Sequence, residues 1–199
     1  MSASFSITWD YRCPFARIVH DHVVTGLQGG ADWDVTFVPF SLDQSHVDEL
    51  ETPVWEHPDD FPGLLANQVG IVVRDRYPEK FLGVHRAIFE ARHSEARDTR
   101  DRKVLSAVLE ANRVDAADVF SQVGDGWPLK TFREEHEAAV AEHEVFGVPT
   151  FVVGDSATFV RLMEGPRGDA QVAKETIDKV LDLFGWPVLN EFKHTTIRS

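Results

Sequence analysis

The one cysteine of this 199-residue chain is the residue with the clearest chemical reason for its position. Cys13 follows residues 5–9, a hydrophobic run typical of a strand, and precedes residues 15–27, a stretch typical of a helix. Pro14 then takes the first helical position, which proline favours. Unpaired N–H groups and the helix dipole stabilise an anion at such a junction. The sequence therefore predicts a nucleophilic thiolate, with a pKa lowered from about 8.5 to between about 3.5 and 7.5.

The motif around Cys13 holds one sulfur instead of two. Position 16, where a C-x-x-C redox pair would carry its second cysteine, is Ala16, so the chain cannot close an internal disulfide. The alternative is that Cys13 is a small buried hydrophobic residue, as free cysteines often are. The neighbouring proline, strand and helix favour the reactive interpretation.

The order of predicted elements is β-α-β, then helices, then β-β-α. A second strand over residues 34–40 completes a right-handed β-α-β unit with parallel strands. A proline-rich loop over 52–63 and a short apolar stretch over 64–73 follow, and after them four segments are typical of helices: 79–92, 102–112, 115–123 and 130–146. Residues 148–153 and 157–162 predict a hairpin, and 170–184 a last helix. The chain is therefore an α/β protein in which an all-helical domain, 42–146, is inserted between 1–41 and 147–199.

Composition limits the kinds of partner. A formal net charge of −13 argues against nucleic acid, which needs clustered Lys and Arg. The hydrophobic fraction of 43% suits a globular core, and no apolar run approaches the roughly 18–20 residues of a membrane span. One cysteine and no apolar secretory region near the start favour the reducing cytoplasm. We expect a monomer or a homodimer that acts on a small-molecule thiol, disulfide or electrophile.

Two segments far apart in the sequence carry a family resemblance: Asp10-x-x-Cys13-Pro14-Phe15-Ala16 and Phe146-Gly147-Val148-Pro149-Thr150. Together they resemble the DsbA-type branch of the thioredoxin superfamily, which includes kappa-class glutathione transferases and 2-hydroxychromene-2-carboxylate isomerases. The actinobacterial, mycothiol-dependent DsbA-like group is the most similar. Its members share a related cysteine motif, a segment like Pro166-Arg167-Gly168-Asp169 and an ending like residues 187–198. The resemblance covers nearly the whole chain and implies a thioredoxin fold with a large helical insertion.

The resemblance also implies a binding surface around the thiol. In the family, the proline that corresponds to Pro149 is cis and lies against the cysteine. Such a bond would leave the Val148 backbone free to pair with a bound thiol peptide. Residues expected at this surface are Pro14, Phe15, Val148, Pro149, Thr150 and Arg167. Arg167 and the helix start near it could hold a carboxylate of the thiol cofactor, but a loop with an ordinary helix cap is the interpretation that this segment favours.

The expected activity is monothiol thiol-disulfide exchange. Cys13 would form a mixed disulfide that an external thiol, mycothiol or glutathione, must resolve because Ala16 cannot. A first alternative is a kappa-like S-transferase or an isomerase. A second is a non-catalytic thioredoxin-fold binding protein, which the alanine at position 16 favours.

Other charged and aromatic residues admit more than one interpretation. Arg12 and Arg17 could add positive potential near the thiol, and Asp10 could relay protons or cap the strand end. Nine histidines do not show metal-ligand spacing, so no metal is expected. The remaining aromatics either line a cleft over the thiol or belong to the core: Trp55, Phe61, Tyr77, Phe81 and Phe89. Trp186 and Phe192, in the tail, are expected to pack back on the body.

Overall fold

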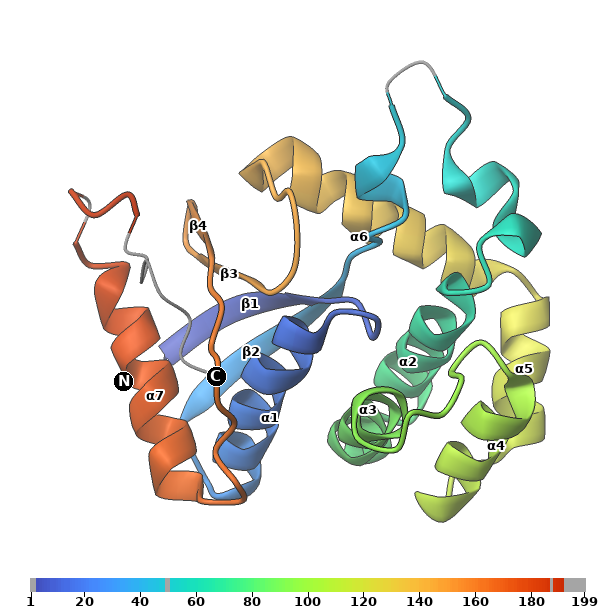
Figure 1. Cartoon of the computed structure of the whole chain (residues 1–199), viewed down its shortest axis with the longest axis horizontal. Helices are drawn as coiled ribbons and strands as arrows, with labels where there is room; N and C mark the ends of the chain where they lie inside the picture. The colour runs from blue at the N-terminus through green and yellow to red at the C-terminus, as the bar shows by residue number, and fades with distance from the viewer. Residues whose placement is uncertain (1–2, 49–50, 187, 192–199) are drawn as a thin grey trace.

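A four-stranded mixed sheet joins strands from the N-terminal part of the chain to a hairpin from its C-terminal part (Figure 1). The computed structural model describes residues 3–48, 51–186 and 188–191. The strand order is β2-β1-β3-β4; β1 pairs parallel with β2, and β3 pairs antiparallel with β1 and β4. The strands are β1 (Ala3–Trp9), β2 (Trp33–Pro39), β3 (Thr150–Val153) and β4 (Ser156–Phe159). The predicted parallel unit and the late hairpin are confirmed.

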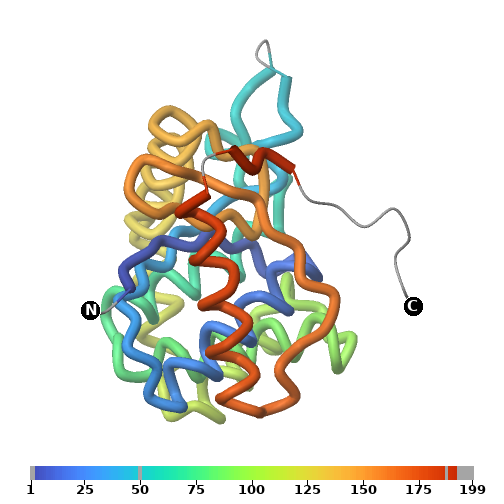
Figure 2. The backbone as a smooth tube through the Cα atoms, turned by 90° about the vertical axis from the view of Figure 1, so that its left-hand side faces the viewer, coloured from blue at the N-terminus to red at the C-terminus, as the bar shows by residue number. Residues whose placement is uncertain are grey.

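Helices α1 (Pro14–Gln28) and α7 (Ala170–Leu183) lie side by side against the sheet (Figures 1 and 2). They meet closely where α1 ends: a Cβ at Gly29 would lie 2.3 Å from the Cβ of Ala170. Phe5 of β1 is buried, and so are the consecutive residues Ile7, Thr8 and Trp9, because both faces of the strand are covered near its end. This packing fixes the start of α1, and with it Cys13, at the end of β1.

The segment between β2 and β3 is helical, as predicted. Its helices are α2 (Leu64–Arg76), α3 (Pro78–His93), α4 (Arg102–Ala111), α5 (Ala116–Gly124) and α6 (Trp127–His143), and three 3₁₀ turns precede them at Gln44–His46, Val54–Glu56 and Pro58–Asp60. One continuous buried core joins these helices to the sheet, so the proposed boundaries at 42 and 146 stay a prediction. The close approach of α2 to the strand-to-helix loop needs glycine, because a Cβ at Gly70 would lie 2.6 Å from the Tyr11 hydroxyl.

Two sequence predictions outside the site need correction. Helix α6 begins three residues earlier than predicted and ends at His143, since Glu144 takes a left-handed conformation with φ 52°. Trp186 does not pack into the body, because 55% of it is exposed. Phe192 lies outside the described residues. Within the described part of the chain, every helix is too short or too polar to cross a membrane.

Candidate active site

Cys13 is the N-cap residue of α1. Its backbone is extended (φ −83°, ψ 117°), and its sulfur accepts a hydrogen bond from the N–H of Ala16 at 3.4 Å. Pro14 stands at the start of the helix, where a missing N–H costs no hydrogen bond. Only 7% of Cys13 is exposed, and Ala16 is fully buried beneath it. The sulfur therefore sits in the predicted junction, within a nearly closed site.

The loop before β3 closes over the thiol. The Val148–Pro149 bond is cis, as the resemblance implied. The Cys13 thiol donates to the carbonyl oxygen of Val148 at 3.4 Å. Thr150 holds the loop in place from behind: its N–H donates to Thr8 Oγ1 at 2.9 Å, and its hydroxyl donates to the Gly147 carbonyl at 2.8 Å. Residues separated by 135 positions in the sequence thus meet at the sulfur.

The thiol is not the acidic group that its helix position suggested. Burial is the largest influence and raises the pKa of Cys13 above its ordinary value. The N–H groups of Ala16 and Phe15 lower this pKa, the Asp10 carboxylate raises it, and the Arg161 guanidinium lowers it. The prediction of a lowered pKa is wrong, because desolvation of the thiolate outweighs the helix start.

The two arginines beside the cysteine motif have other partners. Arg12 forms ion pairs with Asp10 at 3.1 Å and with Asp43 at 2.6 Å. Asp10 is fully buried and also accepts the backbone N–H groups of Arg12 and Leu42, which is the capping role rather than a proton relay. Arg17 donates to the Ser94 hydroxyl at 2.8 Å. Each guanidinium therefore has a hydrogen-bond partner other than the sulfur.

A different arginine reaches the site. The Arg161 guanidinium lies over the Phe15 ring, 4.7 Å from its centroid. The N–H of Val160 donates to the carbonyl oxygen of Pro149, so the segment after β4 is tied to the loop that covers Cys13. The sequence analysis missed Arg161, because no local pattern distinguishes it within the predicted strand 157–162.

Arg167 is remote from the thiol. The segment from Glu164 to Ala170 runs along α1 toward its C-terminal end: the Glu164 carbonyl accepts from His22, and Ala170 meets Gly29. The 15 residues of α1 span about 22 Å at 1.5 Å each, which puts Cys13 at the opposite end. The side chain of Arg167 is 84% exposed and pairs with Glu164 at 3.5 Å. Asp169 caps α7, so the ordinary helix cap explains this segment.

Three neutral side chains form a buried hydrogen-bonded chain beneath the site. Because a carbonyl only accepts, His20 Nε2 donates to the Thr8 oxygen at 3.0 Å. His20 Nδ1 then accepts from His85 at 2.9 Å, and His85 Nδ1 accepts from the Tyr11 hydroxyl at 2.8 Å. Burial lowers the pKa of His20 to about 4, lowers the pKa of His85 well below its ordinary value and raises the pKa of Tyr11.

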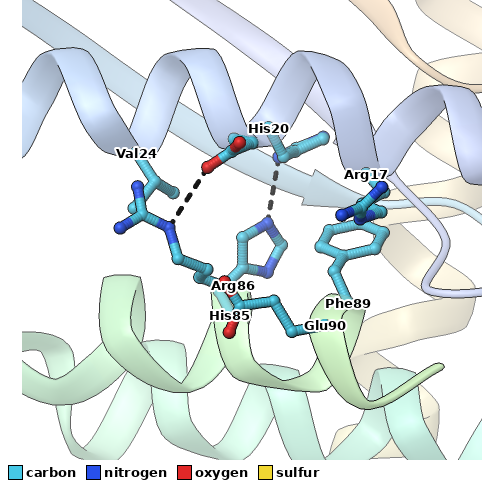
Figure 3. A pocket seen from close by; sticks show the side chains of 8 residues that line it. Arg17, His20, Val24, His85, Arg86, Phe89 and Glu90 are labelled. Carbon is cyan, nitrogen blue, oxygen red and sulfur yellow. Dashed lines mark hydrogen bonds and ion pairs between the residues drawn. The ribbon is translucent and has the colours of Figure 1, made fainter. Parts of the chain in front are cut away.

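Figure 3 shows the two histidine rings between α1 and α3, beside a cavity of about 20 Å³ that Arg17 and Glu90 also line. Such a volume holds about one water molecule. In the residues that the structure describes, no three His, Cys, Asp or Glu side chains come together as metal ligands. Most of the aromatics considered for a cleft belong to the core instead. Trp55 packs on Phe132, and Phe81 packs on Trp9.

This fold and a thiol at the start of α1 beside a cis-proline define a thiol-disulfide oxidoreductase of the thioredoxin fold. The family model of the DSBA-like thioredoxin domain matches residues 6–169. The chain therefore belongs to the DSBA-like family. No curated protein matches it by sequence.

Solved structures share the fold at low sequence identity. DsbA from Pseudomonas aeruginosa is 19% identical with a TM-score of 0.56, and the match covers 92% of this chain and 86% of that one. MdbA from Actinomyces oris, a thiol-disulfide oxidoreductase, is 18% identical with a TM-score of 0.62, over 87% and 80% of the two chains. A 2-hydroxychromene-2-carboxylate isomerase is 14% identical with a TM-score of 0.63, over 94% and 100%.

Proposed function

We propose that the protein catalyses monothiol thiol-disulfide exchange, with Cys13 as the nucleophile and mycothiol or glutathione as co-substrate. The observation that supports this most is the hydrogen bond between the Cys13 thiol and the Val148 carbonyl at the cis-proline loop. The sulfur of a substrate bound along this loop lies next to the nucleophile. The backbone of a peptide-like substrate can pair with Val148 as an added strand would. We also propose that the protein acts in the reducing cytoplasm, which its single cysteine favours.

The reaction balances without a second protein sulfur. The Cys13 thiolate attacks one sulfur of R–S–S–R′, forms Cys13–S–S–R and releases R′–S⁻. An external thiolate then attacks the R sulfur and forms a new disulfide, and Cys13 leaves as the thiolate. Ala16 fills the place of a resolving cysteine with a buried methyl group, so an external thiol is required. Burial raises the pKa of the Cys13 thiol, so the reaction proceeds through the fraction of Cys13 that is ionised.

Mass spectrometry of the intact protein tests the proposal. After incubation with oxidised glutathione or oxidised mycothiol near neutral pH, we expect one adduct that excess thiol removes. The Cys13→Ser variant, which has no thiol, is the control and should form none. Wild-type protein that stays unmodified while native, yet is modified after unfolding, would contradict the proposal.

The likeness of fold to an isomerase supports a second candidate, an S-transferase or isomerase in which the cofactor's own thiol attacks. Full turnover of an electrophile by Cys13→Ser, with no disulfide exchange in the wild type, would favour it. A non-catalytic binding protein is the third candidate. A thiol that exchanges with no disulfide, even after Ala16→Cys restores a pair, would favour that one.

A further inference from the structure

Arg161 offers a positive charge that the surrounding chain leaves available. The protein has a formal net charge of −13, and seven arginines of its described part form ion pairs with carboxylates. Arg12, Arg74 and Arg86 each pair with an aspartate. Within the described residues, no ion pair joins Arg161 to a carboxylate, and its guanidinium packs on the Phe15 ring. A guanidinium on an aromatic face keeps its forked N–H donors free for an anion.

Two contacts place the Arg161 guanidinium near the Cys13 sulfur. Phe15, under the guanidinium, is two residues from Cys13 on the first turn of α1. Val160, next to Arg161, donates to Pro149 O, and the carbonyl of Val148 accepts from the thiol. Arg161 is exposed, whereas Cys13 is nearly buried, so an incoming molecule meets the guanidinium at the surface of the site.

We propose that Arg161 is a specificity-determining residue that binds a carboxylate of the thiol or disulfide substrate and thereby selects anionic substrates for Cys13. The inference rests on the proposed function and narrows it. Glutathione carries two carboxylates, whereas mycothiol carries none, so the arginine favours the glutathione class of co-substrate. An acidic protein repels anionic thiols, and a local cation at the thiol offsets this repulsion. The forked donors of arginine match a carboxylate better than a lysine ammonium does.

The test compares disulfides of different charge with the same nucleophile. The probes are 5,5′-dithiobis(2-nitrobenzoate), which is anionic, 2,2′-dithiodipyridine, which is neutral, and cystamine, which is cationic. We take the ratio of the anionic to the neutral rate constant. Any change in thiolate fraction cancels in this ratio, because Cys13 attacks both probes. If the guanidinium lies about 6 Å from the charge of a bound probe and solvent screens them partly, it changes the rate constant for that probe about 3- to 10-fold.

We expect Arg161→Gln to lower this ratio about 3- to 10-fold, and Arg161→Glu to shift the preference toward cystamine. Arg161→Lys should keep part of the preference, and added salt should weaken it in the wild type. Arg167→Gln is the matched control, since Arg167 is an exposed arginine at the opposite end of α1 from Cys13, and its ratio should equal that of the wild type.

Two negative results have different meanings. An unchanged ratio in Arg161→Gln, with Cys13 still reactive toward all three probes, would overturn the inference and leave the proposed function intact. A native wild-type protein that reacts with none of the probes would overturn the proposed function itself. Circular dichroism and thermal unfolding show whether each variant is folded, and only the ratios of folded variants are compared.

Discussion

Lowering the pH should destabilise the protein through histidines that are buried in their neutral form. His136 is 4% exposed, and its Nδ1 accepts the Ser41 N–H at 3.2 Å. Burial lowers the pKa of His136 from 6.5 to about 4. Between these two values the unfolded chain binds a proton that the folded protein does not. Stability is therefore present above pH 6.5 and is lost as the pH falls toward 4.

The size of this effect follows from the same shift. A shift of one pKa unit corresponds to about 1.36 kcal/mol. Because the pKa of His136 falls from 6.5 to about 4 on folding, the free energy of unfolding should decrease by about 2 kcal/mol between pH 7 and pH 5. His20, with a pKa of about 4, adds a similar amount. The two residues together should lower the free energy of unfolding by about 4 kcal/mol over this range.

Denaturant unfolding at the two pH values measures the difference. His136→Gln keeps an acceptor for the Ser41 N–H but cannot titrate, so its loss of stability from pH 7 to pH 5 should be about 2 kcal/mol smaller than that of the wild type. His57→Gln, at an exposed histidine, is the control and should behave as the wild type does. The same pH dependence in His136→Gln and wild type would refute the assignment of His136 as a buried neutral group.

Three further predictions concern the site. The rate constant for alkylation of Cys13 by iodoacetamide should keep rising above about pH 8, because burial raises the pKa of the thiol and the thiolate attacks; a plateau near neutral pH would contradict this. Ala16→Cys should form an intramolecular disulfide on mild oxidation, which mass spectrometry detects as the loss of two hydrogens. Because position 16 is fully buried, the larger side chain should lower the free energy of unfolding of the reduced variant by about 1–3 kcal/mol. Thr8→Val should lower the free energy of unfolding by about 1–3 kcal/mol, since the Thr150 N–H loses its buried acceptor; Ser4→Ala, at an exposed residue of the same strand, should change it little.

The strand before the thiol and the helix after it could be predicted from the residues close to them in the sequence. The strand before Cys13, the proline at the first helical position and the helix after it each depend on residues close in sequence. The predicted segment 115–123 begins at Asp115, which caps α5 by accepting from the N–H groups of Ala117 and Asp118, because an N-cap bond spans two or three residues. The cis bond at Pro149 followed from the family resemblance rather than from local propensity.

The electrostatics of the site depend on long-range packing. Arg12 looked suited to stabilise a thiolate, but Asp43 binds it from 31 residues away. Arg167 looked like a ligand for the cofactor, but the chain carries it along α1 away from the sulfur. Arg161 gave no local signal, because only the pairing of β3 with β4 and the bond from Val160 to Pro149 bring it to α1.

The sequence by itself determined that this protein has one thiol, that the thiol begins a helix, and that no second cysteine can resolve a mixed disulfide. These properties belong to composition and to neighbouring residues. Tertiary structure decided how readily the thiol ionises and which cation faces it, because both depend on the solvent that packing removes and on charges that folding brings near. Burial of Cys13 under the Val148–Pro149 loop outweighed the helix start and reversed the direction of the expected pKa shift.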